Sequence, residues 1–200
     1  NDIFTVEMDC VEGRKGEKEA LLTLTWKELS LQIALFLEEK TSENVISALD
    51  KLEEALGESL FMKVFPLILT DNGPEFNNIS AMETSKIGCK RTKIFFCDPR
   101  HSEQKGSCEN HHKMIRYCIP KGASLKPYSQ SDISLMMNHI NSYKRKALFG
   151  KSAYDLARGA LPEDFFVLLG LEEVAPDKII LNPSIFCHSN CNSKKALHLL

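Results

Sequence analysis

The chain has 200 residues, of which 43% are hydrophobic and 26% are charged, and its formal net charge is −2. These values are typical of a globular chain that is long enough for one well-buried core. The nearly balanced charge argues against a dedicated nucleic-acid-binding module, which would be clearly basic. It does not exclude an enzyme that clusters carboxylates and leaves phosphate binding to a separate basic domain.

The N-terminal sequence and the lengths of the apolar runs bear on location. No stretch approaches the roughly 18 consecutive apolar residues that a membrane helix needs. The first ten residues, NDIFTVEMDC, have a strand-like pattern. They do not have the basic start and the apolar stretch of a signal peptide. We therefore expect a cytoplasmic protein, and the abrupt start suggests that a basic domain has been cut away from it.

The seven cysteines, at positions 10, 89, 97, 108, 118, 187 and 191, are odd in number and have no framework spacing. We expect free thiols, most of them buried. Cys187, His188, Cys191 and His198 form one tight cluster that contains potential zinc ligands. Their spacing matches no strong zinc pattern, so a loosely ordered tail is the favoured interpretation and a metal site the alternative.

The first half of the chain is predicted to alternate strands and helices. Alternating apolar residues predict strands at residues 3 to 11, 21 to 26 and 31 to 38, joined as an antiparallel meander. A helix is predicted from an N-cap at Thr41 or Ser42 to Gly57. The apolar run from 64 to 70 predicts a buried strand, residues 79 to 87 a short helix, and residues 92 to 97 a further strand. Together these elements predict an α/β fold with a mixed five-stranded sheet.

The second half is predicted to be helical. Helices are expected at about 107 to 118 and 130 to 146, followed by two short helices in SAYDLARG and LPEDFFVLLG and an irregular extension beyond Gly170. The aromatic residues of the predicted strands are expected in the core: Trp26, Phe36, Phe65, Phe95 and Phe96.

Three acidic residues have positions that suit a metal centre. Asp9 lies in the middle of a predicted strand, Asp71 ends a strand next to an Asn-Gly turn, and Glu109 begins a helix. Phosphodiester chemistry by two hard cations needs acidic oxygens that converge from different elements. Each residue alone also fits an ordinary role, on a solvent-facing strand, in a turn or at a helix N-terminus. The three together favour the metal centre.

Three sequence blocks resemble those of the DDE transposases and retroviral integrases, most closely insertion-sequence family 30. The blocks are MDCVEG, LTDNGPEF and FFCDPRHSEQKGSCENHHKMIRYCIPKG. The third has the family's residues at Asp98, Pro99, Gly106, Glu109, Asn110, Arg116, Pro120, Lys121 and Gly122. Asp71 and Glu109 are separated by 37 residues, because 109 minus 71 is 38. The resemblance covers about residues 1 to 160.

The resemblance implies a fold, a domain division and a reaction. The fold would be ribonuclease-H-like, with a catalytic core at 1–150 and a helical and irregular C-terminal extension at 151–200. Asp9, Asp71 and Glu109 would hold two Mg²⁺ or Mn²⁺ ions. The activity would be hydrolysis at transposon ends, followed by attack of the freed 3′ hydroxyl on target DNA. The family's N-terminal helix-turn-helix portion, which recognises transposon ends, has no counterpart in this sequence.

The resemblance also implies DNA as the partner, a homo-oligomer and a bacterial, nucleoid-associated location. Candidate DNA contacts gather near the predicted site: Lys105, Lys113, Arg116, Lys121 and Asn72. A solvated helix face is an equally good explanation of the basic residues. Glu75 is a further neighbour of Asp71, and His111 and His112 are interpreted as surface residues. Lys144, Arg145 and Lys146 are expected to end the long helix and complement its dipole.

Two alternatives remain. The same fold serves stand-alone nucleases, although the Pro-Lys-Gly block and the trailing helices make this less favoured. An inactive core would only bind DNA or mediate oligomerisation. An intact acidic triad distinguishes an enzyme from such a scaffold, which has no physical reason to keep it.

Overall fold

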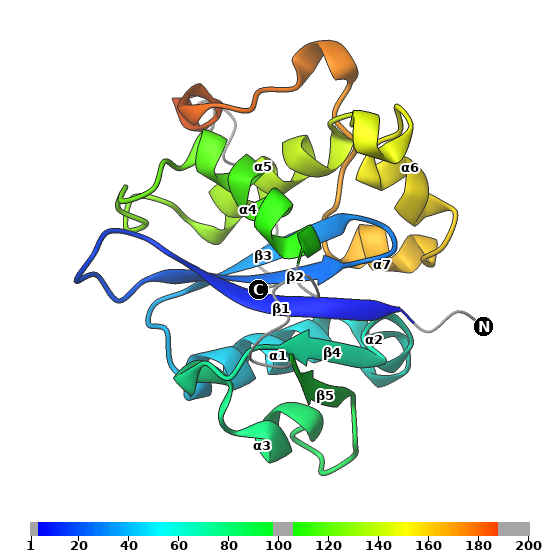
Figure 1. The fold of residues 1–200 in the computed structure, drawn as a ribbon. Helices are drawn as coiled ribbons and strands as arrows, with labels where there is room; N and C mark the ends of the chain where they lie inside the picture. The colour runs from blue at the N-terminus through cyan, green and yellow to red at the C-terminus, as the bar shows by residue number, and fades with distance from the viewer. Residues whose placement is uncertain (1–3, 98–105, 188–200) are drawn as a thin grey trace.

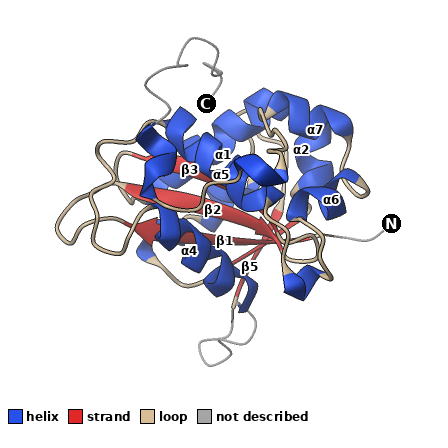
Figure 2. Ribbon diagram, turned by 90° about the horizontal axis from the view of Figure 1, so that it is seen from above, coloured by secondary structure: helices blue, strands red, loops and turns tan. Residues whose placement is uncertain are grey.

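The computed structural model describes residues 4–97 and 106–187, and for residues 106–110 it describes the main chain only. A five-stranded sheet with the strand order β3-β2-β1-β4-β5 lies at the centre. In Figure 1 the sheet separates α4 and α5 on one side from α1 and α3 on the other, and Figure 2 shows the same sheet from above. The strands are β1 Thr5–Glu12, β2 Ala20–Trp26, β3 Leu31–Leu37, β4 Leu67–Thr70 and β5 Lys93–Phe96.

The sheet is mixed, as predicted. Strands β1, β2 and β3 form an antiparallel meander, while β4 pairs in parallel with both β1 and β5. A short turn joins β2 to β3 and contains Ser30 at φ 52°. A parallel partner for β1 requires a crossover, which the helices between β3 and β4 provide.

Helix α1, Ser42–Leu56, confirms the predicted capping signals. The Thr41 side chain accepts a hydrogen bond from the Asn44 N–H at 3.3 Å, and the helix ends at Gly57, where φ is 76°.

A second helix, α2 Glu58–Val64, follows directly, where the sequence pattern had predicted no helix. Pro66 explains why this helix ends where it does. Proline disfavours helical geometry in the preceding residue, Phe65, which has φ −122° and ψ 50°. Strand β4 therefore begins at Leu67, three residues later than predicted.

The remaining helices follow the predicted order: α3 Ile79–Glu83, α4 Gly106–Cys118, α5 Gln130–Ser142, α6 Ala153–Arg158 and α7 Glu163–Leu168. Short 3₁₀ turns span Pro74–Phe76, Lys146–Leu148, Pro176–Lys178 and Pro183–Cys187. The prediction that the basic stretch Lys144–Lys146 ends the long helix is wrong. Helix α5 stops four residues earlier than predicted, because Tyr143 has extended backbone angles, φ −71° and ψ 122°.

Apolar side chains form a core on each face of the sheet. One core lies against α1, α2, α6 and α7 and includes Trp26 and Phe65, both fully buried. The other lies against α4 and α5. The prediction that Phe95 is a core residue is wrong, since its side chain is 51% exposed. Strand β5 is an edge strand, and the described residues of the second core come from β1, β2 and β3 on the sheet side. Phe36 and Phe96 are partly buried.

The free edge of β3 is covered by two side-chain amides of α5. Asn141 accepts from the Gln32 N–H at 3.1 Å and donates to the Gln32 carbonyl at 2.7 Å. Gln130 accepts from the Phe36 N–H at 2.7 Å and donates to the Ala34 carbonyl at 3.0 Å. These four bonds satisfy main-chain groups that an edge strand leaves unpaired.

The described cysteines are all free: Cys10, Cys89, Cys97, Cys118 and Cys187. Cys118 alone among them is buried, so the expectation of mostly buried thiols is wrong for this set. His188, Cys191 and His198 lie outside the described residues. Within the described ranges, no helix combines the length and the apolar character that crossing a membrane requires.

Candidate active site

The parallel pairing of β1 with β4 brings Asp9 and Asp71 toward the same edge of the sheet. The register pairs Thr5 with Leu67 and Glu7 with Leu69, an offset of 62 residues. Strand β4 ends at Thr70, and the same offset carried one residue beyond this end would put Asp71 opposite Asp9, since 9 plus 62 is 71. The Thr70 hydroxyl donates to the Met8 carbonyl at 3.1 Å, so the two chains remain in contact at the end of β4. Asp9 and Asp71 therefore lie toward the same edge of the sheet, and both are close enough to Cys10 to affect the pKa of its thiol.

Asp9 points to the face of the sheet that α4 and α5 cover. Side chains alternate between the two faces along a strand. Met8 belongs to the core beside α1, whereas Val11 belongs to the core beneath α4 and α5. Asp9, two residues before Val11, shares the face of Val11. Asp9 is half-buried and Asp71 is exposed.

Main-chain hydrogen bonds orient both carboxylates. Asp9 Oδ1 accepts from the Cys10 N–H at 2.8 Å, and Asp71 Oδ1 accepts from the Gly73 N–H at 3.1 Å. The second bond closes the Asn-Gly turn that the sequence predicted directly after β4. A charged carboxylate held by an N–H group is more firmly positioned than one that is only solvated.

Helix α4 approaches the same region through His112. The Thr23 hydroxyl donates to the Asp9 carbonyl at 3.1 Å and lies 3.1 Å from His112 Nε2. Thr23 is also the ladder partner of Asp9 across β1 and β2. Figure 1 shows the N-terminal end of α4 above β1. Position 109 precedes His112 by three residues, so on the helix surface the two positions are neighbours about one turn apart.

The third predicted ligand, Glu109, therefore lies on the helix that approaches Asp9, but its side chain is outside the description. Among the described side chains, no group of three His, Cys, Asp or Glu residues lies close enough together to hold a metal ion. The roles of Asp9, Asp71 and Glu109 as metal ligands all stay predictions.

Lys40 was not predicted as a site residue, yet it forms ion pairs beside the aspartates. Its Nζ lies 2.6 Å from Glu12 Oε1 and 3.2 Å from Glu75 Oε1. Burial alone lowers the pKa of Lys40, but hydrogen bonds to Glu12 and Glu75 outweigh it and raise the pKa overall. Its sequence position, directly before the N-cap Thr41, gave no sign of this role.

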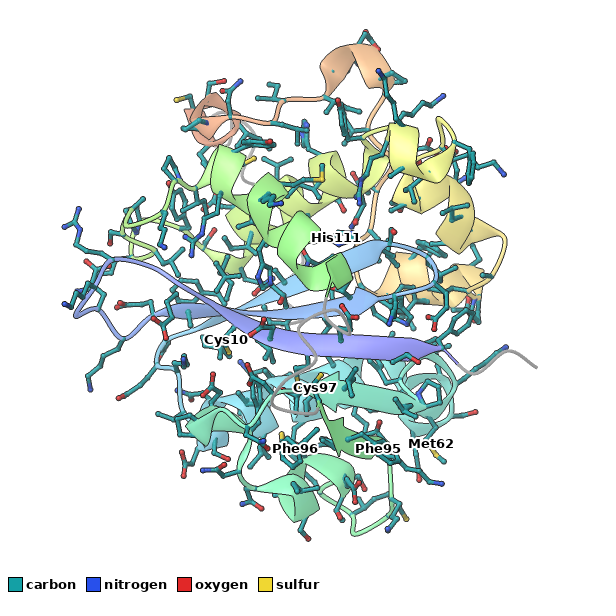
Figure 3. All side chains as sticks on the ribbon, in the orientation of Figure 1. Cys10, Met62, Phe95, Phe96, Cys97 and His111 are labelled. Carbon is teal, nitrogen blue, oxygen red and sulfur yellow. The ribbon has the colours of Figure 1, made fainter. Side chains whose placement is uncertain are left out.

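The pKa of the Cys10 thiol depends on several charged groups at this end of the sheet. Burial raises the pKa of the Cys10 thiol, and the negative charge of Glu75 adds to the effect. Lys40 lowers the same pKa, whereas Asp9 and Asp71 raise it. Figure 3 shows Cys10 on β1, at the end of the strand that carries Asp9. Four charged groups from different parts of the chain are therefore close enough to act on one thiol.

The predicted DNA contacts have different surroundings. Lys113, Lys121 and Asn72 are exposed. Arg116 is half-buried, and its Nη2 donates to the Glu12 carbonyl at 2.8 Å, which ties α4 to the end of β1. Burial lowers the pKa of Arg116, and the charge of Glu12 opposes this shift. Lys105, like Asp98 and Pro99 of the third block, lies outside the described residues.

The interpretation of His111 as a surface residue is wrong. Its side chain is 2% exposed, and Nε2 lies 2.8 Å from the Ser30 carbonyl and 2.9 Å from Arg145 Nη1. These contacts join α4 to the β2–β3 turn and to the segment after α5, and Figure 3 shows His111 on α4 above the sheet. His112 is half-buried. The change from buried His111 through half-buried His112 to exposed Lys113 follows the rotation of successive residues around the helix.

Comparisons with known proteins agree with this architecture, although no family model matches the chain. The chain is 30% identical over 151 residues to transposase InsI for insertion sequence element IS30C of Escherichia coli strain K12. It is 30% identical over 143 residues to the probable transposase for insertion-like sequence element IS1161 of Streptococcus salivarius. These matches cover 75% and 70% of this chain, and 37% of each relative.

Two solved structures have a similar fold. The catalytic core domain of BIV integrase superposes with a TM-score of 0.51 at 17% identity, covering 78% of this chain and 94% of that one. The simian T-cell lymphotropic virus intasome in complex with PP2A regulatory subunit B56 gamma gives a TM-score of 0.56 at 18% identity, covering 86% and 58%. The fold is therefore the ribonuclease-H-like fold of integrase catalytic cores.

The strand order and the two structural likenesses define a ribonuclease-H-like fold, which the chain shares with integrase catalytic cores. In sequence, the chain is similar to the transposases of the insertion elements IS30C and IS1161. It spans about two fifths of the length of these curated relatives.

Proposed function

We propose that this chain is the catalytic part of a DNA transposase, which hydrolyses phosphodiester bonds at transposon ends and joins the ends to target DNA. The observation that carries the proposal is the position of Asp9 on β1 and of Asp71 directly after β4, because β1 and β4 are neighbouring parallel strands. The sequence similarity to the transposases of two insertion sequences supports the same reaction class.

The donor set fits a hard divalent cation. Carboxylate oxygens are the ligands that Mg²⁺ and Mn²⁺ prefer, and Asp9 and Asp71 each have one oxygen oriented by a main-chain N–H. Asp9, Asp71 and Glu109 would together hold two ions. When bound, such ions lower the pKa of a water or hydroxyl group and stabilise charge on the phosphate.

The protein's own residues would align the DNA and shield the site. Lys113 and Lys121 have exposed side chains from which ammonium groups can reach phosphates, and Asn72 lies next to Asp71. Lys105 and Arg116 complete the proposed set of DNA contacts. Arg116 would use the N–H groups that do not bond the Glu12 carbonyl. His112 and Thr23 would hold α4 against the Asp9 main chain.

We propose DNA, both transposon ends and target, as the partner, and a homo-oligomer in a bacterial, nucleoid-associated setting as the working form. Joining two DNA ends to one target requires two active sites held at a fixed spacing. The fold similarity to a chain of a viral intasome is compatible with such an assembly.

The test uses the full-length protein with Mg²⁺ or Mn²⁺, supercoiled plasmid and a duplex that carries the ends of the encoding element. Asp9→Asn, Asp71→Asn and Glu109→Gln are each expected to reduce nicking and joining by roughly 10³-fold or more. Glu54→Gln, which changes an exposed glutamate of α1, serves as the matched control and is expected to keep activity.

Each outcome separates the candidate functions. Nicking without joining would identify a stand-alone nuclease. DNA binding with no metal-dependent nicking by the unmodified protein would identify an inactive DNA-binding or oligomerisation core. Full activity of Asp71→Asn would refute the proposed metal site.

A further inference from the structure

Lys40 joins a solvent-exposed carboxylate to a buried one. Its ammonium group lies 2.6 Å from Glu12 Oε1 and 3.2 Å from Glu75 Oε1. The Glu12 side chain is 68% exposed and the Glu75 side chain is 4% exposed. Because desolvation of a carboxylate is costly unless a positive charge compensates it, the contact with Glu75 is the more consequential of the two. An exposed pair such as that with Glu12 contributes little.

The other oxygen of Glu75 lies against the turn that carries Asp71. A Cβ atom added to Gly73 would lie 2.6 Å from Glu75 Oε2 and 3.1 Å from Asp71 Oδ1. The two carboxylates therefore contact the same glycine, and the two oxygens are at most 5.7 Å apart, the sum of 2.6 and 3.1 Å. Within the described residues, Glu75 Oε2 is buried and has no hydrogen-bond partner.

The position of Glu75 is itself fixed by packing. It lies in the 3₁₀ turn Pro74–Phe76, and the next residue, Phe76, is fully buried in the core beside α1. Phe76 N–H donates to the Gly73 carbonyl at 2.9 Å, which closes the loop between the two carboxylates. Glu75 thus has little freedom to move away from Gly73 while Lys40 holds its Oε1.

We propose that Lys40 and Glu75 form a positioning pair, which orients the Asp71 carboxylate for catalysis. This inference rests on the proposed function of Asp71. Glu75 supports the turn from the side opposite to solvent, and the ion pair with Lys40 holds Glu75 in place. Without Lys40, the buried Glu75 would turn toward water and no longer support the Gly73 turn. Without the charge of Glu75, the turn would relax and Asp71 would bind a cation less well.

The test compares Glu75→Gln and Lys40→Met with Glu12→Gln in the full-length protein. Glu12→Gln is the matched control, because it removes the other carboxylate partner of Lys40 without touching the Asp71 turn. The first two variants are expected to raise the Mg²⁺ concentration for half-maximal nicking about tenfold, the size usual for residues that orient a metal ligand. Glu12→Gln is expected to change it by less than about twofold.

A second readout does not depend on activity. The Gly73 amide proton, which bonds Asp71 Oδ1, is expected to shift in the NMR spectra of Glu75→Gln and Lys40→Met but not of Glu12→Gln. Mn²⁺ titration of the same samples by electron paramagnetic resonance measures the cation affinity directly. Lys40→Arg keeps the charge and is expected to restore most of the affinity and the Gly73 resonance.

Controls separate this inference from its premise. If Asp71→Asn abolishes activity while Glu75→Gln and Lys40→Met match the unmodified protein in Mg²⁺ dependence and Gly73 shift, the positioning pair is refuted and the proposed function stands. If Asp71→Asn stays active, the proposed function itself fails. A variant with a lowered melting temperature but unchanged Mg²⁺ dependence would show a purely structural role and overturn the inference.

Discussion

Gly73 is held between two carboxylates, and its lack of a side chain is what the site requires. Its φ of −61° and ψ of 146° suit any residue, so the constraint is space and not backbone conformation. The nearest atom to an added Cβ would be Glu75 Oε2 at 2.6 Å, closer than real Cβ atoms come to an oxygen. Since Glu75 is buried and paired with Lys40, the turn is expected to yield instead.

Gly73→Ala is therefore expected to reduce metal-dependent nicking about tenfold or more while changing the free energy of unfolding by no more than about 1 kcal/mol. Plasmid nicking and urea unfolding measure the two effects. Gly159→Ala is the control, because an added Cβ there would have no neighbour closer than 3.7 Å and the φ is −78°. Unchanged nicking by Gly73→Ala would mean that Glu75 moves aside freely.

At this scale the sequence predicted some residues and missed others for a physical reason. The positions of Asp9 in a strand and of Asp71 directly after a strand were predictable, because the alternating pattern and the turn residues indicate them. The similarity of the sequence blocks to those of transposases singled out the same two residues. The ion pair of Lys40 with the buried Glu75 was not predictable, because its members are 35 positions apart and charged residues are usually solvated. Only the approach of Lys40, before α1, to the Asp71 turn brings the two side chains together.

At the scale of elements, the amides of α5 substitute for a sixth strand at the β3 edge. Asn141 is fully buried and pairs with both main-chain groups of Gln32. The main-chain groups of β3 that form these bonds belong to every second residue, at 32, 34 and 36. An edge strand directs its unpaired N–H and carbonyl groups outward with the same two-residue period.

Asn141→Ala is expected to lower the free energy of unfolding by about 2–3 kcal/mol, because the Gln32 N–H and carbonyl would stay buried without partners. Urea unfolding followed by circular dichroism measures the change. Ser131→Ala, at an exposed position of the same helix, is expected to change the stability by less than about 0.5 kcal/mol. A loss below about 0.5 kcal/mol for Asn141→Ala would show that water replaces the amide at this edge.

The order of strands and helices was predictable from periodicity and capping, whereas their ends depended on tertiary structure. Helix α2 was missed because FMKVF, with four apolar residues in five, suits a strand as well as a helix. The exposure of Phe95 could not be predicted from a strand pattern, since whether β5 has a cover on that face depends on where α4 and α5 lie.

At the scale of the whole molecule, α6 and α7 complete the core beside α1. Phe165 of α7 is fully buried, and its ring meets Trp26 edge-on with 5.2 Å between centroids. Trp26 in turn donates from Nε1 to the Val64 carbonyl at 2.8 Å, so the contact connects α7, β2 and α2. The predicted domain boundary at residue 150 separates segments that share this core.

Phe165→Ala is expected to destabilise the protein by about 3–5 kcal/mol through loss of the aromatic contact and the cavity left behind. Val167→Ala, on the same helix but at a position that is 66% exposed, is expected to cost less than about 0.5 kcal/mol. Thermal and urea unfolding of both variants provide the measurement. If Phe165→Ala leaves the main transition unchanged, residues 1–150 fold as a unit that does not need α7.

The pairing of β1 with β4 also imposes an order of events while the chain is being made. Asp9 emerges from the ribosome 62 residues before Asp71, and 100 residues before Glu109. The hairpin of β1 and β2 can form early, but one side of β1 has no partner until β4 has been synthesised. On the proposed function, a nascent chain that is interrupted before residue 109 never carries the full set of metal ligands. Products that end before residue 109 would therefore lack the proposed metal-dependent activity.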